Sequence, residues 1–121
     1  MKVIVNEYIP FKGFIAFNFF GIIFVRLDEY LKFDKLHNKH AYDVILNHEK
    51  IHTEQMKELL YIFFYLIYCV EYLIKFICCF NFHKAYHNVS FEKEAFDNEF
   101  NLKYLENRKR YNWIKYLFHC F

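Results

Sequence analysis

The placement of helix-breaking residues constrains the fold of this chain most strongly. The chain has 121 residues, and its single proline and both glycines (Pro10, Gly13 and Gly21) lie near the N-terminus. Residues 22–121 contain neither type, so nothing in their backbone chemistry interrupts helix formation. We therefore predict turns and strands early in the chain and a mostly helical remainder.

Residues 3–5, 14–20 and 22–26 are short runs of β-branched and aromatic side chains. Such runs between turn residues are typical of two or three short strands, with a hairpin among them. Residues 27–40 predict a short helical turn or a loop. The predicted fold class is α+β, mainly α: a short N-terminal β-hairpin or strands, followed by a packed bundle of three to four helices, a minimal zincin-like arrangement. One domain would span residues 1–121, with a strand region at 1–26 and a helical region at 41–121.

A helix is expected to start near Tyr42 or Asp43. Polar side chains recur there in steps of three and four, which is the spacing of one solvent-facing stripe on a helix. The stripe consists of Asp43, Asn47, Lys50, Glu54, Lys57 and Glu58. The opposite side carries Ile45, His48, His52, Met56 and Leu59. Both histidines should therefore point toward the interior.

Residues 59–80 predict a second, strongly apolar helix. Its hydroxyl groups align on one side, at Tyr61, Tyr65, Tyr68 and Tyr72, and the remaining face is aliphatic. Our main interpretation is a buried core helix, and the alternative is a helix in or on a membrane. The charged pair Glu71 and Lys75 disfavours a spanning helix. A membrane surface or a partner chain could contact residues 59–80 and the aromatic tail at 111–121.

Residues 81–90 read as a connection, and residues 89–109 as a further helix with Glu92 and Glu94 near its start. Residues 111–121 predict a short aromatic helix. The basic run Arg108-Lys109-Arg110 is expected to be a solvated helix end, or alternatively a contact for anionic lipid headgroups.

Charge and cysteine content exclude several classes of function. The net charge of +2 is too balanced for a general nucleic-acid binder. Two glycines cannot build a phosphate-binding loop. The four cysteines contain no Cys-x-x-Cys pair, so we expect them to be reduced, buried thiols. Reduced thiols indicate a cytoplasmic protein. The protein would be membrane-associated if the apolar helix at 59–80 contacts lipid. No secretory leader is expected, because Glu7 follows the N-terminus too closely.

The sequence His48-Glu49-Lys50-Ile51-His52 carries the main chemical prediction. Residues four apart lie on one helix face, so both imidazoles can reach one metal ion. Glu49 would then act on a metal-activated water as general base. We predict one Zn²⁺ ion with His48 and His52 as ligands. Two core histidines without a metal are the competing interpretation.

A catalytic zinc site needs a third protein ligand and an open position. The acidic segment at 91–99 supplies carboxylates on a separate helix, and we favour Glu92 over Glu94 as the ligand. Here the chain resembles the gluzincin metallopeptidases, in which a second helix brings a glutamate to zinc. The Glu92-x-x-Ala95 pattern is similar to that of CAAX-prenyl-type and antibiotic-sensor-type membrane metallopeptidases. Phe96 departs from it, because those families place an aspartate there.

The chain also resembles a set of short uncharacterised bacterial proteins over residues 8–26, 47–73 and 84–105, a likeness that implies no activity. In gluzincins a strand edge beside the site often pairs with extended peptide, and residues 14–26 could do the same. Tyr86 is our first candidate for a transition-state donor, ahead of His83 and His87.

The favoured function is thus a zinc-dependent metallopeptidase or peptidase-like hydrolase acting on a peptide or protein, with Glu49 and Tyr86 as catalytic residues. A non-catalytic, zinc-stabilised helical module would use the same ligands. A small membrane-associated protein with an incidental motif is the third interpretation.

Overall fold

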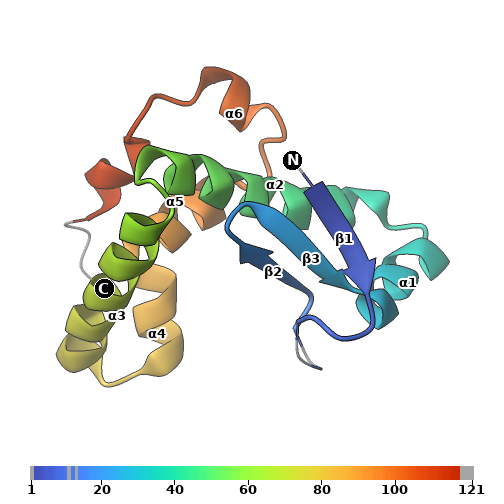
Figure 1. Cartoon of the computed structure of the whole chain (residues 1–121), viewed down its shortest axis with the longest axis horizontal. Helices are drawn as coiled ribbons and strands as arrows, with labels where there is room; N and C mark the ends of the chain where they lie inside the picture. The colour runs from blue at the N-terminus through green and yellow to red at the C-terminus, as the bar shows by residue number, and fades with distance from the viewer. Residues whose placement is uncertain (1, 11, 13, 118–121) are drawn as a thin grey trace.

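The computed structural model describes residues 2–10, 12 and 14–117. It confirms a mainly helical α+β fold with a small N-terminal sheet (Figure 1). The strands are β1 (Lys2–Asn6), β2 (Ala16–Phe19) and β3 (Ile22–Arg26). The helices are α1 (Leu27–Lys35), α2 (Lys39–Glu58), α3 (Ile62–Cys79), α4 (Phe82–Asn88), α5 (Ser90–Asn98) and α6 (Tyr104–Asn107), followed by the 3₁₀ helix η1 (Asn112–Tyr116).

The sheet has the strand order β1-β3-β2. β2 and β3 form the predicted antiparallel hairpin, with Phe19 opposite Ile22, and β1 pairs with β3 in parallel. Phe20 and Gly21 make the turn with φ angles of 50° and 90°. Two left-handed residues match the twist of a tight hairpin, and glycine adopts this conformation without strain.

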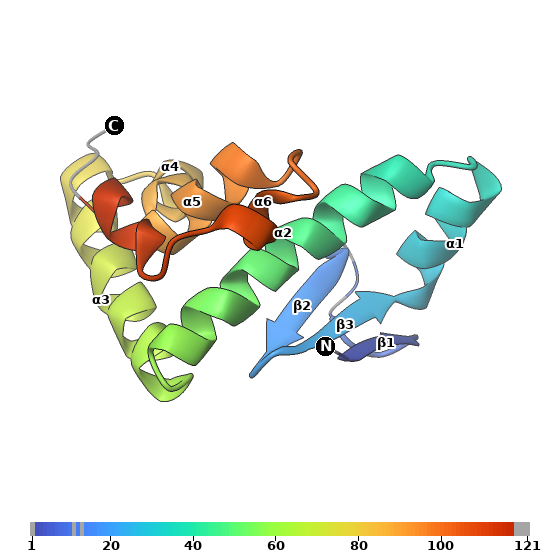
Figure 2. The same ribbon diagram turned by 90° about the horizontal axis from the view of Figure 1, so that it is seen from above.

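The sheet packs against α2 through β2, and β3 contacts α1 (Figure 2). Ile23 and Val25 of β3 are completely buried. Asn18 of β2 donates from its side-chain amide to the backbone oxygen of Glu49, at 2.9 Å, and to Oγ1 of Thr53, at 3.0 Å. The hairpin is therefore fixed to α2 at the level of the histidine motif.

The first two helices differ from the sequence prediction at their starts. The segment expected to be a helical turn or loop contains the nine-residue helix α1. The next helix begins at Lys39 rather than at Tyr42 or Asp43, because Asn38 caps it: its side chain accepts a hydrogen bond from the backbone N–H of Ala41, at 3.2 Å.

The interpretation of residues 59–80 as a buried core helix is wrong. Only 17% of α3 is buried, and it lies at one edge of the molecule in both views (Figures 1 and 2). Among the described residues it is the one helix whose length and composition suffice to cross a membrane. The three tyrosines of α3 and Tyr61 just before it are partly buried, whereas the aliphatic face is exposed.

Two predictions for the C-terminal half are corrected. Residues 82–88 form the helix α4 rather than a connection, and Asn81 caps it by accepting from the backbone N–H of Lys84. The helix predicted over 89–109 ends at Asn98. Asn47 explains this end: its amide donates to the backbone oxygens of Glu99, at 2.8 Å, and Asn101, at 3.0 Å. Asn47 is therefore buried and not part of a solvent-facing stripe.

Arg108 is not part of a solvated helix end. Its guanidinium is buried and makes two hydrogen bonds to Glu58, at 3.0 and 3.1 Å, and two to Glu94, at 2.6 and 3.0 Å. The following turn, η1, brings Trp113 into the core. The buried apolar cluster consists of Met56, Phe64, Val89, Phe91 and Trp113. Residues 118–121 of the predicted aromatic tail lie outside the described part.

The cysteines that the structure describes are free thiols. Cys69 and Cys78 are exposed, against the expectation of burial, and Cys79 is half-buried. Cys120 lies outside the described residues.

Candidate metal centre

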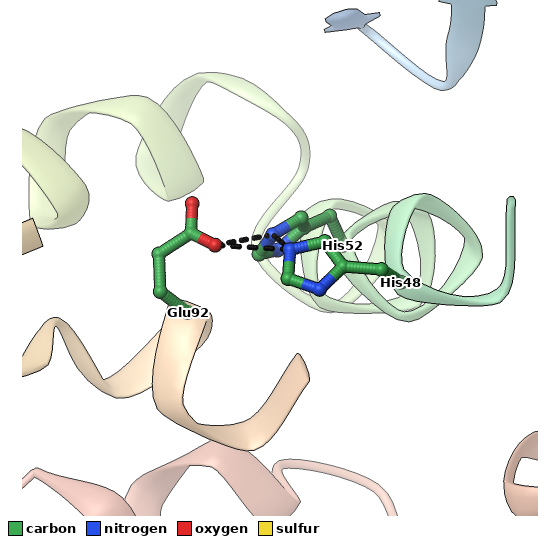
Figure 3. Close-up of side chains that lie close together, drawn as sticks. All are labelled: His48, His52 and Glu92. Atoms are coloured by element: carbon green, nitrogen blue, oxygen red, sulfur yellow. Dashed lines mark hydrogen bonds and ion pairs between the residues drawn. The ribbon is translucent and has the colours of Figure 1, made fainter. Parts of the chain in front are cut away.

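Three predicted ligands meet at one point between α2 and α5 (Figure 3). Nε2 of His48 and Nε2 of His52 lie 3.1 Å apart. Oε1 of Glu92 lies 3.1 Å from the former and 3.0 Å from the latter. All three side chains are buried. Within residues 2–10, 12 and 14–117 they form the one group of three or more metal-binding side chains.

The start of α5 is held in place by the polar residues of α3. Glu71 accepts hydrogen bonds from the backbone N–H of Ser90, at 2.5 Å, and from its hydroxyl, at 2.6 Å. Lys75 donates to the backbone oxygen of Asn88 and pairs with Glu71. Because Glu92 follows Ser90 by two residues, these contacts position its carboxylate opposite the histidines.

The spacing of the three atoms fits a small cation. Two ligands at about 2.0–2.1 Å from zinc in tetrahedral geometry are about 3.3 Å apart. The three observed separations are 3.0–3.1 Å. Three acceptor atoms this close repel one another unless a proton or a metal ion lies between them. The buried group can therefore hold a metal ion.

The outer nitrogen of each histidine has its own hydrogen-bond acceptor. Nδ1 of His48 lies 2.8 Å from Oε2 of Glu99, and Nδ1 of His52 lies 2.8 Å from Oε1 of Gln55. Gln55 Nε2 donates to the backbone oxygen of Phe91 and to Glu94, so its Oε1 faces His52 as an acceptor. Each Nδ1 therefore donates to its partner. In a neutral ring this leaves Nε2 to offer its lone pair to a cation at the point between the three ligand atoms, which we call the metal point.

The sequence analysis did not identify Gln55 or Glu99 as hydrogen-bond partners, although their distance in sequence from a predicted ligand indicates the position of each. Gln55 stands three residues after His52, which places it on the same helix face. Glu99 stands seven residues, or two helical turns, after Glu92. Gln55 thus lies on the helix face of His52, and Glu99 on that of Glu92.

Glu94, the alternative third ligand, lies away from the metal point. It is completely buried and accepts hydrogen bonds from Arg108, from Tyr104 at 2.6 Å, and from Gln55 at 2.9 Å. Burial raises the pKa of its carboxyl, but these donors, Arg108 first among them, lower it below its ordinary value. Glu94 thus orients Gln55, which in turn orients His52.

Glu92 offers one oxygen to the metal point and the other to the protein. The hydroxyl of Tyr68 donates to its Oε2 at 2.7 Å. Burial disfavours the charged carboxylate, yet His52 and His48 together lower the pKa of Glu92 far below its usual range. Burial likewise opposes protonation of His52, and Glu92 more than offsets it, raising the pKa of His52 to about 9. The centre is therefore built to attract positive charge.

A cleft of about 310 Å³ opens beside these ligands. The predicted catalytic residues Glu49 and Tyr86 both line it, together with His52 and Glu92. Burial raises the pKa of the Glu49 carboxyl, as does the nearby Glu92 charge, while His52 and His48 oppose the shift. A raised pKa suits a general base that works near neutral pH.

Tyr86 is the candidate donor that reaches the cleft. Its side chain is 37% exposed, and burial and the Glu92 carboxylate raise its pKa, so the hydroxyl keeps its proton. His87 instead stacks on Phe96, with ring centroids 4.4 Å apart. His83 packs against His87 and is not among the cleft-lining residues.

Comparison with known proteins finds no match. No family model matches the chain, and no curated protein or solved structure is similar to it. The resemblance to gluzincins therefore stays an expectation from the motif residues, and the function has to be argued from the site.

The opposite wall of the cleft comes from the β2 region. Phe14, Ala16 and Phe17 line the cleft and also a second, almost entirely apolar pocket of about 360 Å³. Residues 8–10 close the far side of that pocket. A molecule lying across β2 would contact the metal point and the apolar pocket together.

Proposed function

We propose that this protein is a zinc-dependent hydrolase of the metallopeptidase type. The observation that carries the proposal is the convergence of three buried ligand atoms within 3.1 Å, with both histidine Nδ1 atoms bonded to Glu99 and Gln55.

The choice of zinc rests on the donor set. Two imidazoles and one carboxylate, with a cleft beside them, are typical of catalytic zinc sites with an open fourth position. Non-haem Fe(II) sites use the same three donors, so metal analysis distinguishes the two. A bound zinc ion would polarise a substrate carbonyl and bring the pKa of a water near neutrality.

The chain's own residues would carry the proton transfers. Glu49 would take a proton from the attacking water and deliver it to the leaving amine nitrogen when the C–N bond breaks. The hydroxyl of Tyr86 would donate to the oxygen that gains negative charge. Tyr68 would keep Glu92 oriented through the 2.7 Å hydrogen bond to Oε2.

The substrate we favour is an extended peptide. β2 is an edge strand, and its residues Ala16, Phe17 and Asn18 line the cleft beside Glu49. An edge strand can pair with a peptide backbone through main-chain hydrogen bonds. The adjoining apolar pocket would accept an apolar side chain of that peptide. The three free thiols favour a reducing compartment such as the cytoplasm.

A non-catalytic, metal-stabilised module is the second candidate. Support for it comes from the origin of the ligands, because an ion bound by His48, His52 and Glu92 would tie α2 to α5. Both candidates predict metal binding, and only the first predicts turnover.

The test compares three variants with the wild type for zinc content and for cleavage of a fluorescence-quenched peptide library. We expect His48→Ala to lose both zinc and cleavage, and Glu49→Gln to keep zinc and lose cleavage. Glu54→Gln is the matched control, since the Glu54 side chain is 41% exposed on the same helix and pairs with Lys57. Zinc binding without cleavage by any form would assign the non-catalytic role. Absence of zinc from the wild type would refute both candidates.

A further inference from the structure

The two faces of α3 are oriented opposite to those of an ordinary surface helix, whose apolar face packs on the protein and whose polar face meets water. Its tyrosine side faces the protein: Tyr65 contacts the β2–β3 turn, and Tyr68 binds Glu92. Its two charged residues, Glu71 and Lys75, are also buried and bind the start of α5. The polar groups of α3 therefore point inward, and hydrocarbon points outward.

The outward side of α3 is a continuous apolar stripe, which we call the α3 stripe. Its members are large apolar side chains, each more than half exposed. They are Ile62, Phe63, Leu66, Val70, Leu73, Ile74 and Ile77. At 100° per residue they fall within an arc of about 120°, and the stripe is about 22 Å long. No charged side chain lies within this arc.

We propose that the α3 stripe docks on a lipid bilayer, with α3 parallel to the membrane surface. Apolar patches of this extent mark interaction sites. A protein interface of similar size contains hydrogen bonds and a polar rim. The stripe provides neither, because its side chains are hydrocarbon throughout. It is also wider than the seam that a pair of helices buries between two copies of a chain.

The surroundings of α3 favour a surface position over a spanning one. Glu71 and Lys75 lie next to one edge of the stripe, where they line a groove with stripe residues of α3, and their charged groups bind the α4–α5 junction. α4 packs along α3 and carries the exposed residues His83 and Lys84. A spanning α3 would draw these groups into hydrocarbon. With the stripe alone inserted, α4, α5 and the metal centre stay in water.

The experiment is flotation of the full-length chain with vesicles of pure phosphatidylcholine. We expect the wild type to float with the vesicles, and to do so equally at high salt because the stripe carries no charge. In Leu73→Asp the partition coefficient should fall by about tenfold or more, since a carboxylate is strongly disfavoured in hydrocarbon. Ile77→Asp should behave in the same way.

Leu36→Asp is the matched control. Leu36 is 73% exposed but lies between α1 and α2, outside the stripe, so flotation should not change. Circular dichroism and urea unfolding check that each variant is folded, independently of any metal.

Four results would overturn the proposal. The first is a wild type that stays with the aqueous fraction, and the second is equal flotation of Leu73→Asp. A lipid-free dimer that Leu73→Asp converts to a monomer, without vesicle binding, would assign the stripe to a second copy. Flotation that requires phosphatidylglycerol would point to basic residues rather than to the stripe.

Discussion

The contact between Glu99 and His48 allows a quantitative prediction for metal affinity. Oε2 of Glu99 lies 2.8 Å from Nδ1 of His48, and both side chains are largely buried. This carboxylate fixes the imidazole ring and makes Nε2 a stronger donor to a cation. Removing it in Glu99→Ala should weaken zinc binding without touching a ligand.

Two independent magnitudes give the expected loss of zinc affinity in Glu99→Ala. A hydrogen bond to a charged group contributes about 1.5–3 kcal/mol. Loss of an outer partner of a metal-binding histidine weakens affinity by about 10–100-fold, or about 1.4–2.7 kcal/mol. We therefore expect the zinc Kd of Glu99→Ala to rise by about 10–100-fold. Glu99→Gln keeps an acceptor oxygen but loses the charge, so its Kd should lie between the two.

The assay is competition for zinc against a chromophoric chelator at fixed pH. Asp97→Ala serves as the control. Asp97 is exposed on α5, and its substitution by alanine removes the same charge as Glu99→Ala. A Kd of Glu99→Ala within about twofold of the wild type would refute the reasoning. An equal loss in Asp97→Ala would show that net charge, and not the contact with His48, sets the affinity.

Three further predictions concern the contacts around the centre. Tyr68→Phe removes the donor to Glu92 Oε2 and should raise the zinc Kd by about fivefold, measured by the same competition. Arg108→Met leaves Glu58 and Glu94 buried without their partner and should lower the free energy of urea unfolding by about 3–5 kcal/mol. Because the folded pKa of Glu94 is lowered, its contribution to stability is complete above its unfolded pKa and is lost as pH falls through the folded pKa. Urea unfolding from about pH 6 to pH 3 should therefore show a steeper acid loss in the wild type than in Arg108→Met.

The sequence predicted that the three candidate ligands come together, because their placement depends on local periodicity. His48 and His52 share a helix face whatever surrounds the helix, and Glu92 lies one turn into any helix that starts near Ser90. The choice between Glu92 and Glu94 depended on tertiary partners. Glu94 is held by Arg108, fourteen residues further along the chain, and no local pattern marks that pair.

The end of α5 was missed for a related reason. A separate helix was expected from residue 59, and Leu60 and Tyr61, with left-handed φ angles of 55° and 63°, make that break without a glycine. The end of α5 is instead set by Asn47 from another helix. There a long-range contact overrides local helix propensity.

Periodicity also found the two faces of α3 but assigned them to the wrong surroundings. A pattern of tyrosines opposite aliphatic residues identifies an amphipathic helix, yet it does not state which side meets the protein. The hydrogen bonds of Tyr65 and Tyr68 decide this. The sequence rule that apolar residues face the core assumes water outside, and the exposed α3 stripe does not satisfy that assumption.

X-ray absorption at the zinc edge of the metal-loaded protein tests the central claim most directly. We expect one zinc per chain, with nitrogen and oxygen neighbours at about 2.0–2.1 Å and scattering from two imidazole rings. Both ring signals should diminish together with zinc binding in His48→Ala. A sulfur neighbour at about 2.3 Å, or zinc retained by His48→Ala with an unchanged spectrum, would contradict a centre built from His48, His52 and Glu92.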